Sequence, residues 1–103
     1  MAAPSRTVMR ARGSSRYARR SIEAIHAAAR ELNAERALAL AGRYGERAGR
    51  EGRAEAAQKL REFEQRLPIK GPDLTREEID RNKSIGRILA HARKALASEG
   101  DGG

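Results

Sequence analysis

The sequence predicts an all-α protein: a small antiparallel bundle of three to four helices with a disordered basic N-terminal arm. Three observations lead to this prediction. Apolar residues recur every three or four positions along four stretches, no stretch alternates as a strand does, and the first twenty residues carry six arginines and no acid. A chain of 103 residues is one domain by length. We divide it into a flexible arm (1–13), a helical domain (14–98) and a flexible tail (99–103).

The first helix is predicted from about Ser15 to Leu32. Ser14 or Ser15 can cap its start, because a serine hydroxyl accepts a hydrogen bond from an otherwise unpaired amide. The apolar stripe of this helix comprises Ala18, Ile22, Ile25, Ala29 and Leu32. Asn33 then interrupts the pattern, since asparagine both tolerates left-handed backbone and caps helices.

The next two helices are predicted from Ala34 to about Ala48 and from Ala54 to Leu67. Their stripes are Ala37, Ala41, Tyr44 and Ala48, and then Ala56, Leu60, Phe63 and Leu67. Four glycines lie along this region: Gly42, Gly45, Gly49 and Gly52. Either the two stretches form one long helix that a neighbour approaches closely, or Gly49 and Gly52 break it. Each interior glycine costs about 0.8–1 kcal/mol relative to alanine, so we favour the break.

A loop follows, because residues 68–72 contain two prolines and a glycine. Thr75 and Glu78 then form a capping box that opens the last predicted helix, from about Arg76 to Ala97. Its apolar face comprises Ile79, Ile85, Ile88, Leu89, Ala92 and Leu96. Asn82 lies near this face, where it is either buried and fixes helix pairing or sits at the rim.

The composition indicates a thin core and excludes several kinds of site. Of the 40 apolar residues, 20 are alanine, so a homodimer or a bound partner would add stability. There is no cysteine, which excludes disulfides, thiolate catalysis and cysteine zinc sites. No apolar run approaches the roughly 20 residues of a membrane span, and the start lacks the apolar core of a secretory signal.

The N-terminal arginines are the clearest functional signal. The chain has a net charge of +8, whereas residues 21–103, with 16 basic and 14 acidic residues, have only +2. The arginines are Arg6, Arg10, Arg12, Arg16, Arg19 and Arg20. Arginines near phosphates release condensed counterions, which gives affinity without reading a base sequence. The other interpretations are a solvated basic tail and an organelle-targeting presequence.

A second basic surface is predicted on the helix from Ala34 to about Ala48. Arg36, Arg43, Arg47 and Arg50 fall within about 60° of one another on a continuous helix, roughly opposite the apolar stripe. They would add to a phosphate-binding surface. Alternatively, they form an ordinary solvated face that Glu46 and Glu51 partly neutralise.

No pattern of catalytic or cofactor-binding residues was found. His26 and His91 belong to different predicted helices, and neither has a second ligand at metal-binding spacing. The glycines lack the order of a phosphate-binding loop, and no nucleophile lies beside a base. We therefore expect no enzyme activity, no metal and no cofactor.

The sequence thus predicts a non-catalytic accessory or regulatory protein of the cytoplasm that contacts nucleic-acid phosphates through its N-terminal arginines. It does not distinguish DNA from RNA, and it gives no sign of base-specific reading or of membrane binding. The alternative is a protein-binding module, such as an inhibitor, an antitoxin-like neutraliser or an assembly subunit. Such a module would dock an alanine-rich helix face, or the arm, onto an acidic protein. The protein could also assemble as a homodimer. As an alternative location, the N-terminal segment could direct its import into an organelle.

Overall fold

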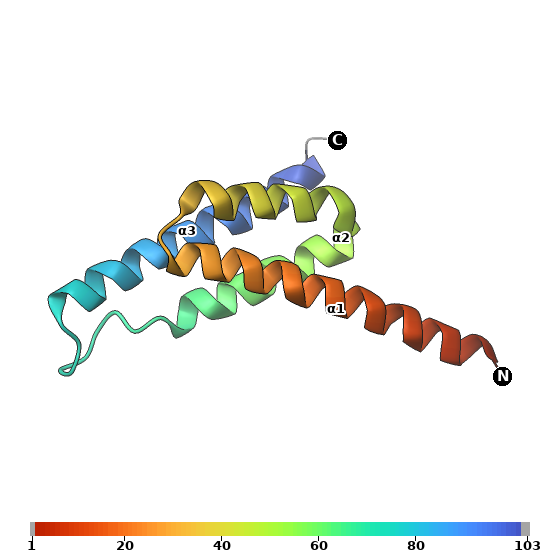
Figure 1. Ribbon diagram of the computed structural model, residues 1–103, viewed down its shortest axis with the longest axis horizontal. Helices are drawn as coiled ribbons and strands as arrows, with labels where there is room; N and C mark the ends of the chain where they lie inside the picture. Colours follow the sequence, from red (N-terminus) through yellow and green to blue (C-terminus); the bar gives the residue numbers. More distant parts are fainter. Residues whose placement is uncertain (1, 102–103) are drawn as a thin grey trace.

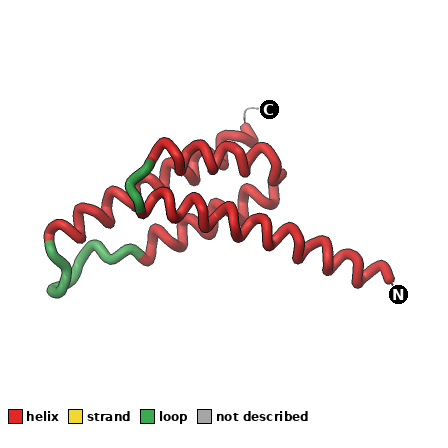
Figure 2. Tube along the Cα trace, viewed as in Figure 1, coloured by secondary structure: helices red, strands yellow, loops and turns green. Residues whose placement is uncertain are grey.

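The computed structural model describes the backbone of residues 2–101 and the side chains of residues 16–97. Within residues 2–101 the chain forms three helices and no strand, so the all-α prediction is confirmed. The helices are α1 (Ala2–Arg30), α2 (Ala34–Arg66) and α3 (Arg76–Asp101). Figure 1 shows the chain turning back at residues 31–33, again along α2, and again in the loop before α3. The two connections that are not helical stand out in Figure 2.

α1 begins much earlier than the sequence predicts. A helix start near Ser15 is wrong, and residues 2–13 are helical rather than the expected disordered coil. Arginine, alanine and methionine favour helix, and Pro4 lies in the first turn, where proline is tolerated. Gly13 costs only about 1 kcal/mol inside a helix, which does not end α1. The side chains of Arg6, Arg10 and Arg12 lie outside the described residues, so their role stays a prediction.

α1 ends in a left-handed turn formed by leucine. The amide of Leu32 donates to Ala29 O at 2.9 Å, and the amide of Asn33 donates to Ala28 O at 2.9 Å. These two bonds define a Schellman motif, with Leu32 at φ 60° in the place that glycine usually takes. Leu32 is therefore 47% exposed and does not continue the apolar stripe. Asn33 caps α2 as predicted, because its Oδ1 accepts from the Arg36 amide at 3.1 Å.

α2 consists of two segments, residues 34–48 and 50–66, joined by a sharp bend at Gly49. Gly49 has φ 75° and ψ 175°, a conformation essentially restricted to glycine. The break that we favoured is thus present at Gly49, but residues 50–53 are helical, so Gly52 is not part of the break and no loop opens there. Two hydrogen bonds span the bend: the Tyr44 hydroxyl to Gly52 O (3.5 Å) and Arg53 Nη1 to Gly45 O (3.3 Å). A Cβ on Gly52 would lie 2.8 Å from Ala48 Cβ, so the close approach here also requires glycine.

The core lies between α2 and its two neighbours. α2 packs against both α1 and α3, whereas α1 and α3 touch each other less. The large side chains that are fully buried are Ile25, Leu60, Leu89 and Leu96. Much of the remaining interior is filled by alanines. The buried alanines are Ala18, Ala28, Ala29, Ala37, Ala41, Ala56 and Ala92. Because alanine is short, the helices can pack closely at these positions.

The loop of residues 67–75 is fixed at both ends. At the start of α3 the Thr75 amide donates to Glu78 Oε1 (2.9 Å), and the Glu78 amide donates to Thr75 Oγ1 (3.0 Å). The predicted capping box is therefore confirmed. Asn82 is half-buried at the rim, and its Nδ2 donates to Pro68 O at 2.8 Å. It thus holds the loop against α3 instead of pairing two helices. α3 continues to Asp101, further than the predicted end at Ala97 and into the segment expected to be a flexible tail.

Candidate nucleic-acid interface

Two arginines from different helices meet in one shallow groove between α1 and the first segment of α2. The groove has a volume of about 280 Å³. We call it the Arg–Tyr groove; its lining residues are Tyr17, Arg20, Ser21, Ala24, Leu40, Arg43 and Tyr44. It contains two guanidinium groups and no carboxylate. The groove therefore joins the two basic surfaces that the sequence predicts separately.

The groove follows from helical spacing on both sides. On α1, residues 17, 20, 21 and 24 are three or four positions apart and so share one face. On α2, residues 40, 43 and 44 do the same. Tyr17 and Tyr44 pack at the contact, with ring centroids 5.5 Å apart and the planes tilted by 38°. The α1–α2 contact thus places Arg20 and Arg43 beside the same pair of rings.

The two tyrosines differ in exposure. Tyr44 is 4% exposed, and Tyr17 is 42% exposed. Burial, with smaller contributions from Glu55 and Tyr17, raises the pKa of Tyr44, so its hydroxyl stays protonated. Tyr44 therefore holds the bend, while Tyr17 offers part of a ring to a ligand.

The arginines of α2 form a shorter row than the sequence predicts. Arg36, Arg43 and Arg47 are exposed and lie on one face of the first segment. Arg50 is exposed as well, but it follows Gly49. Because the helix changes direction there, the spacing of a continuous helix no longer places Arg50 in this row, and its part in the basic surface stays a prediction.

The arginines of α1 also divide between two environments. Arg16 and Arg20 are exposed four residues apart, on the side of the Arg–Tyr groove. Arg19 instead lines a second groove, of about 370 Å³, against the second segment of α2. That groove, which we call the mixed-charge groove, also contains the carboxylates of Glu23, Glu55 and Glu62 and the basic groups of Lys59 and Arg66. Carboxylates there weaken the attraction of Arg19 for an anion.

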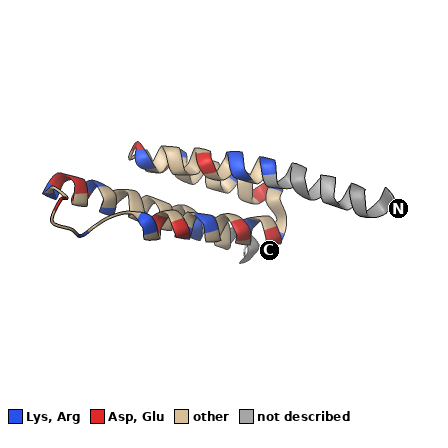
Figure 3. Cartoon of the chain, turned by 90° about the horizontal axis from the view of Figure 1, so that it is seen from below, with Lys and Arg blue, Asp and Glu red and all other residues tan. Residues whose placement is uncertain are grey.

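The arginines that face the Arg–Tyr groove are not used in ion pairs. Ion pairs within residues 16–97 join Lys59 to Glu62, Arg76 to Asp80 and Arg93 to Glu64. None of them involves Arg16, Arg20 or Arg43. Figure 3 shows basic positions at both ends of the described part of α1, with acidic and basic positions mixed along the other helices. The guanidinium groups of the groove are therefore available to an external anion.

Neither histidine lies in a metal site. Within residues 16–97, no cluster of three or more acidic or histidine side chains could hold a metal ion. His26 stacks on Phe63, with ring centroids 4.0 Å apart and planes within 7°. Burial, followed by the charge of Arg30, lowers the pKa of His26. The stack joins α1 to α2, which the sequence did not reveal because the two residues are far apart in the chain.

Among the described residues, none of the helices combines the length and the apolarity that crossing a bilayer requires. The packing of Tyr17 against Tyr44 was also not predicted from the sequence, although the spacing of Tyr17, Arg20 and Ser21 on one helical face indicated it. No protein-family model matches this chain, and the comparisons with curated proteins and with solved structures found no match either.

Proposed function

We propose that this protein is a non-catalytic accessory or regulatory protein that contacts nucleic-acid phosphates through the N-terminal part of α1 and the first segment of α2. The observation that carries the proposal is the convergence of Arg20 and Arg43 on one groove without a carboxylate. Guanidinium groups form two parallel hydrogen bonds to a phosphate, and their charge is attracted to the whole backbone of a nucleic acid.

The proposed framework is a small antiparallel bundle of three to four helices. The reversals of the chain at residues 31–33, at Gly49 and in the loop before α3 support it. In this arrangement the bend at Gly49 lets α1 lie against both segments of α2. The first segment then presents Arg36, Arg43 and Arg47 beside the arginines of α1.

The binding we propose does not read the base sequence. The groove offers two arginines and one half-exposed ring, which suit a phosphate and the sugar or base next to it. The arginines before residue 16 would extend the contact along the backbone. DNA and RNA both supply these groups.

The test is the salt dependence of affinity for a random 20-base-pair duplex. With about four phosphate contacts, the slope of log K against log salt is near −3.6 for duplex DNA. Replacing Arg20 and Arg43 by glutamine removes two contacts and should make the slope shallower by about 1.8. The matched control replaces Lys83 and Arg87 of α3 by glutamine. Both residues are exposed, and their replacement lowers the net charge by the same amount. Equal slopes for the two double variants would contradict the proposal.

A protein partner is the second candidate, because four large apolar side chains within residues 16–97 are exposed. They are Tyr17 (42%), Leu32 (47%), Leu38 (39%) and Ile69 (44%). An acidic partner, or a second copy of this chain, could cover them and stabilise the alanine-rich core. Light scattering with and without the duplex separates the candidates. The second candidate, a protein-binding module, is supported if the protein binds no duplex at low salt but forms a stoichiometric complex with an acidic partner protein.

A further inference from the structure

A second basic cavity lies at the opposite end of the described part of α1 from Tyr17. It is formed where α1 and α2 end and α3 begins, and its volume is about 620 Å³. We call it the three-arginine pocket, because Arg30, Arg66 and Arg81 line it, one from each helix. Its lining contains no carboxylate. This volume is within the range of small-molecule sites, which is roughly 300–1,000 Å³.

The rest of the lining is largely apolar. The stacked rings of His26 and Phe63 contribute to it, together with Ile85 and the loop after α2. Burial and the neighbouring Arg30 lower the pKa of His26, so the imidazole is neutral at neutral pH. The groups that face His26 from the other helices are Phe63 and Arg66 of α2 and Arg81 of α3. The pocket thus combines flat apolar walls with fixed positive charge.

Part of this charge has an ordinary structural role. Arg30 and Arg66 lie in the last turns of α1 and α2, where cations offset the negative end of the helix dipole. Arg81 Nη2 donates to Arg30 O at 3.2 Å, which satisfies a carbonyl at the end of α1. Each helix end carries about half a negative charge, so two ends offset about one of the three positive charges. An excess of about two positive charges remains.

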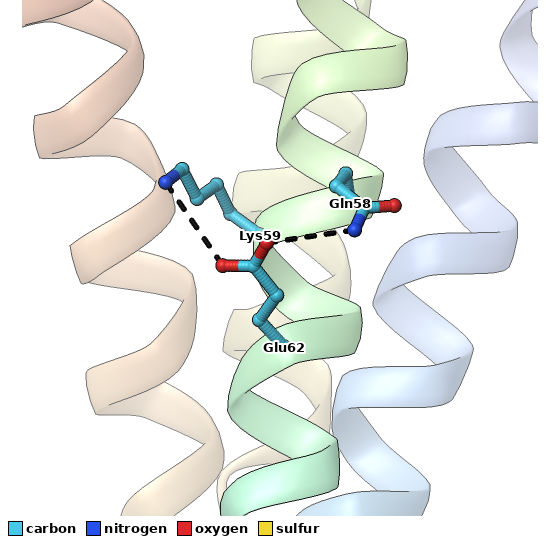
Figure 4. Close-up of polar contacts among 3 residues, drawn as sticks. All are labelled: Gln58, Lys59 and Glu62. Atoms are coloured by element: carbon cyan, nitrogen blue, oxygen red, sulfur yellow. Dashed lines mark hydrogen bonds and ion pairs between the residues drawn. The ribbon is translucent and has the colours of Figure 1, made fainter.

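Arg66 also lines the mixed-charge groove with its three glutamates, but no ion pair within residues 16–97 neutralises the excess. Glu62 is four residues before Arg66, a spacing that favours an ion pair. However, Figure 4 shows Glu62 held instead by Lys59 (3.9 Å) and by the Gln58 amide (3.5 Å). None of the ion pairs found within residues 16–97 involves Arg30, Arg66 or Arg81.

We propose that the three-arginine pocket binds a small molecule that carries a phosphate on a flat ring system, of which a mononucleotide is the simplest example. The guanidinium groups would hold the phosphate, and the ring system would lie against the apolar walls. Inorganic phosphate would gain only the first interaction, and a nucleoside only the second. This site is separate from the Arg–Tyr groove and is independent of nucleic-acid binding there.

The experiment is a calorimetric titration of the full chain with AMP, adenosine and inorganic phosphate. AMP should bind saturably and at least tenfold more tightly than either of the others. Arg66→Gln should weaken AMP binding about tenfold or more, because a hydrogen bond to a charged group is lost. Arg87→Gln, an equal change of charge at an exposed position of α3 that does not line the pocket, should leave it unchanged.

Chemical shifts of the His26 imidazole give a second readout of the same site. A phosphate held beside the ring favours its protonated form, so AMP should raise the pKa of His26. Arg30→Gln provides a second variant if Arg66→Gln does not fold. The proposal is overturned if AMP does not bind saturably, if it binds no better than phosphate, or if Arg66→Gln and Arg87→Gln weaken it equally.

Discussion

Two neighbouring arginines on α1, Arg19 and Arg20, meet different electrostatic surroundings. Arg20 faces Arg43 and two tyrosines in the Arg–Tyr groove, where no carboxylate lies. Arg19 faces the mixed-charge groove, which contains three glutamates. Consecutive helical residues point about 100° apart, so the two side chains reach different segments of α2. A run of arginines in a sequence therefore does not measure the charge that a ligand meets, because the packing partner decides it.

The bend at Gly49 produces this difference, and its loss should have the largest effect. Gly49→Ala places a Cβ in a backbone conformation that costs about 1–3 kcal/mol, and it should lower the free energy of unfolding by that amount. Gly42→Ala is the matched control: its Cβ would meet nothing within 4 Å, so it should stabilise α2 by up to about 1 kcal/mol. Urea unfolding measures both. Similar stabilities for the two variants would show that the bend is not required.

Substitutions of Arg19 and Arg20 themselves provide a direct test of the comparison. Arg20→Gln should weaken duplex binding and make the salt slope shallower by about 0.9, the contribution of one phosphate contact. Arg19→Gln removes the same charge from the adjacent residue and should change the slope less, because three glutamates line the groove that Arg19 faces. Fluorescence anisotropy at several salt concentrations measures the slopes. If the two variants behave alike, total charge and not position governs binding.

The capping box predicts an effect that is confined to the opposite end of the molecule. Thr75→Ala removes the hydroxyl that accepts from the Glu78 amide and should destabilise the protein by about 1 kcal/mol. Duplex affinity under folded conditions should not change, because α3 does not line the Arg–Tyr groove. Thermal unfolding and anisotropy together check this. A loss of affinity in the folded variant would mean that the binding surface extends to α3.

The pH dependence of stability should show a smaller effect, which comes from His26 in the three-arginine pocket. The folded protein lowers the pKa of His26 below 6.5, so the unfolded state takes up its proton first as the pH falls. This contribution to stability is complete above pH 6.5 and decreases as the pH falls through and below that value. Unfolding free energies of the protein and of His26→Gln, measured between pH 5 and 8, should converge toward the acid end. If the difference in unfolding free energy between the two proteins is unchanged across that range, the lowered pKa of His26 is contradicted.

The sequence predicted the elements whose causes are local. The stripe of Ala18, Ile22 and Ile25 is buried, Thr75 and Glu78 cap α3, and Gly49 interrupts α2. Each of these depends on side-chain spacing or on backbone freedom within a few residues. Periodicity and cap residues therefore indicated most of the helical segments before their packing was known.

The features that the sequence did not predict depend on distant or competing contributions. Leu32 takes a left-handed conformation because the end of α1 requires one there, against its own preference. The early start of α1 reflects favourable helix propensity in a segment whose charge suggested disorder. The division between Arg19 and Arg20, and the stack of His26 on Phe63, arise only when α2 folds against α1. The candidate interface was thus predicted as a set of arginines but not as a groove.

The most direct test of the proposed function is to map a short random duplex onto the protein by amide and arginine side-chain NMR signals at low salt. The account predicts that the largest shifts occur at Tyr17, Arg20 and Arg43, with small changes at Arg19 and at Arg87 on α3. Shifts that are centred on α3, or spread evenly over all exposed arginines, would contradict the assignment of the Arg–Tyr groove as the phosphate-binding surface.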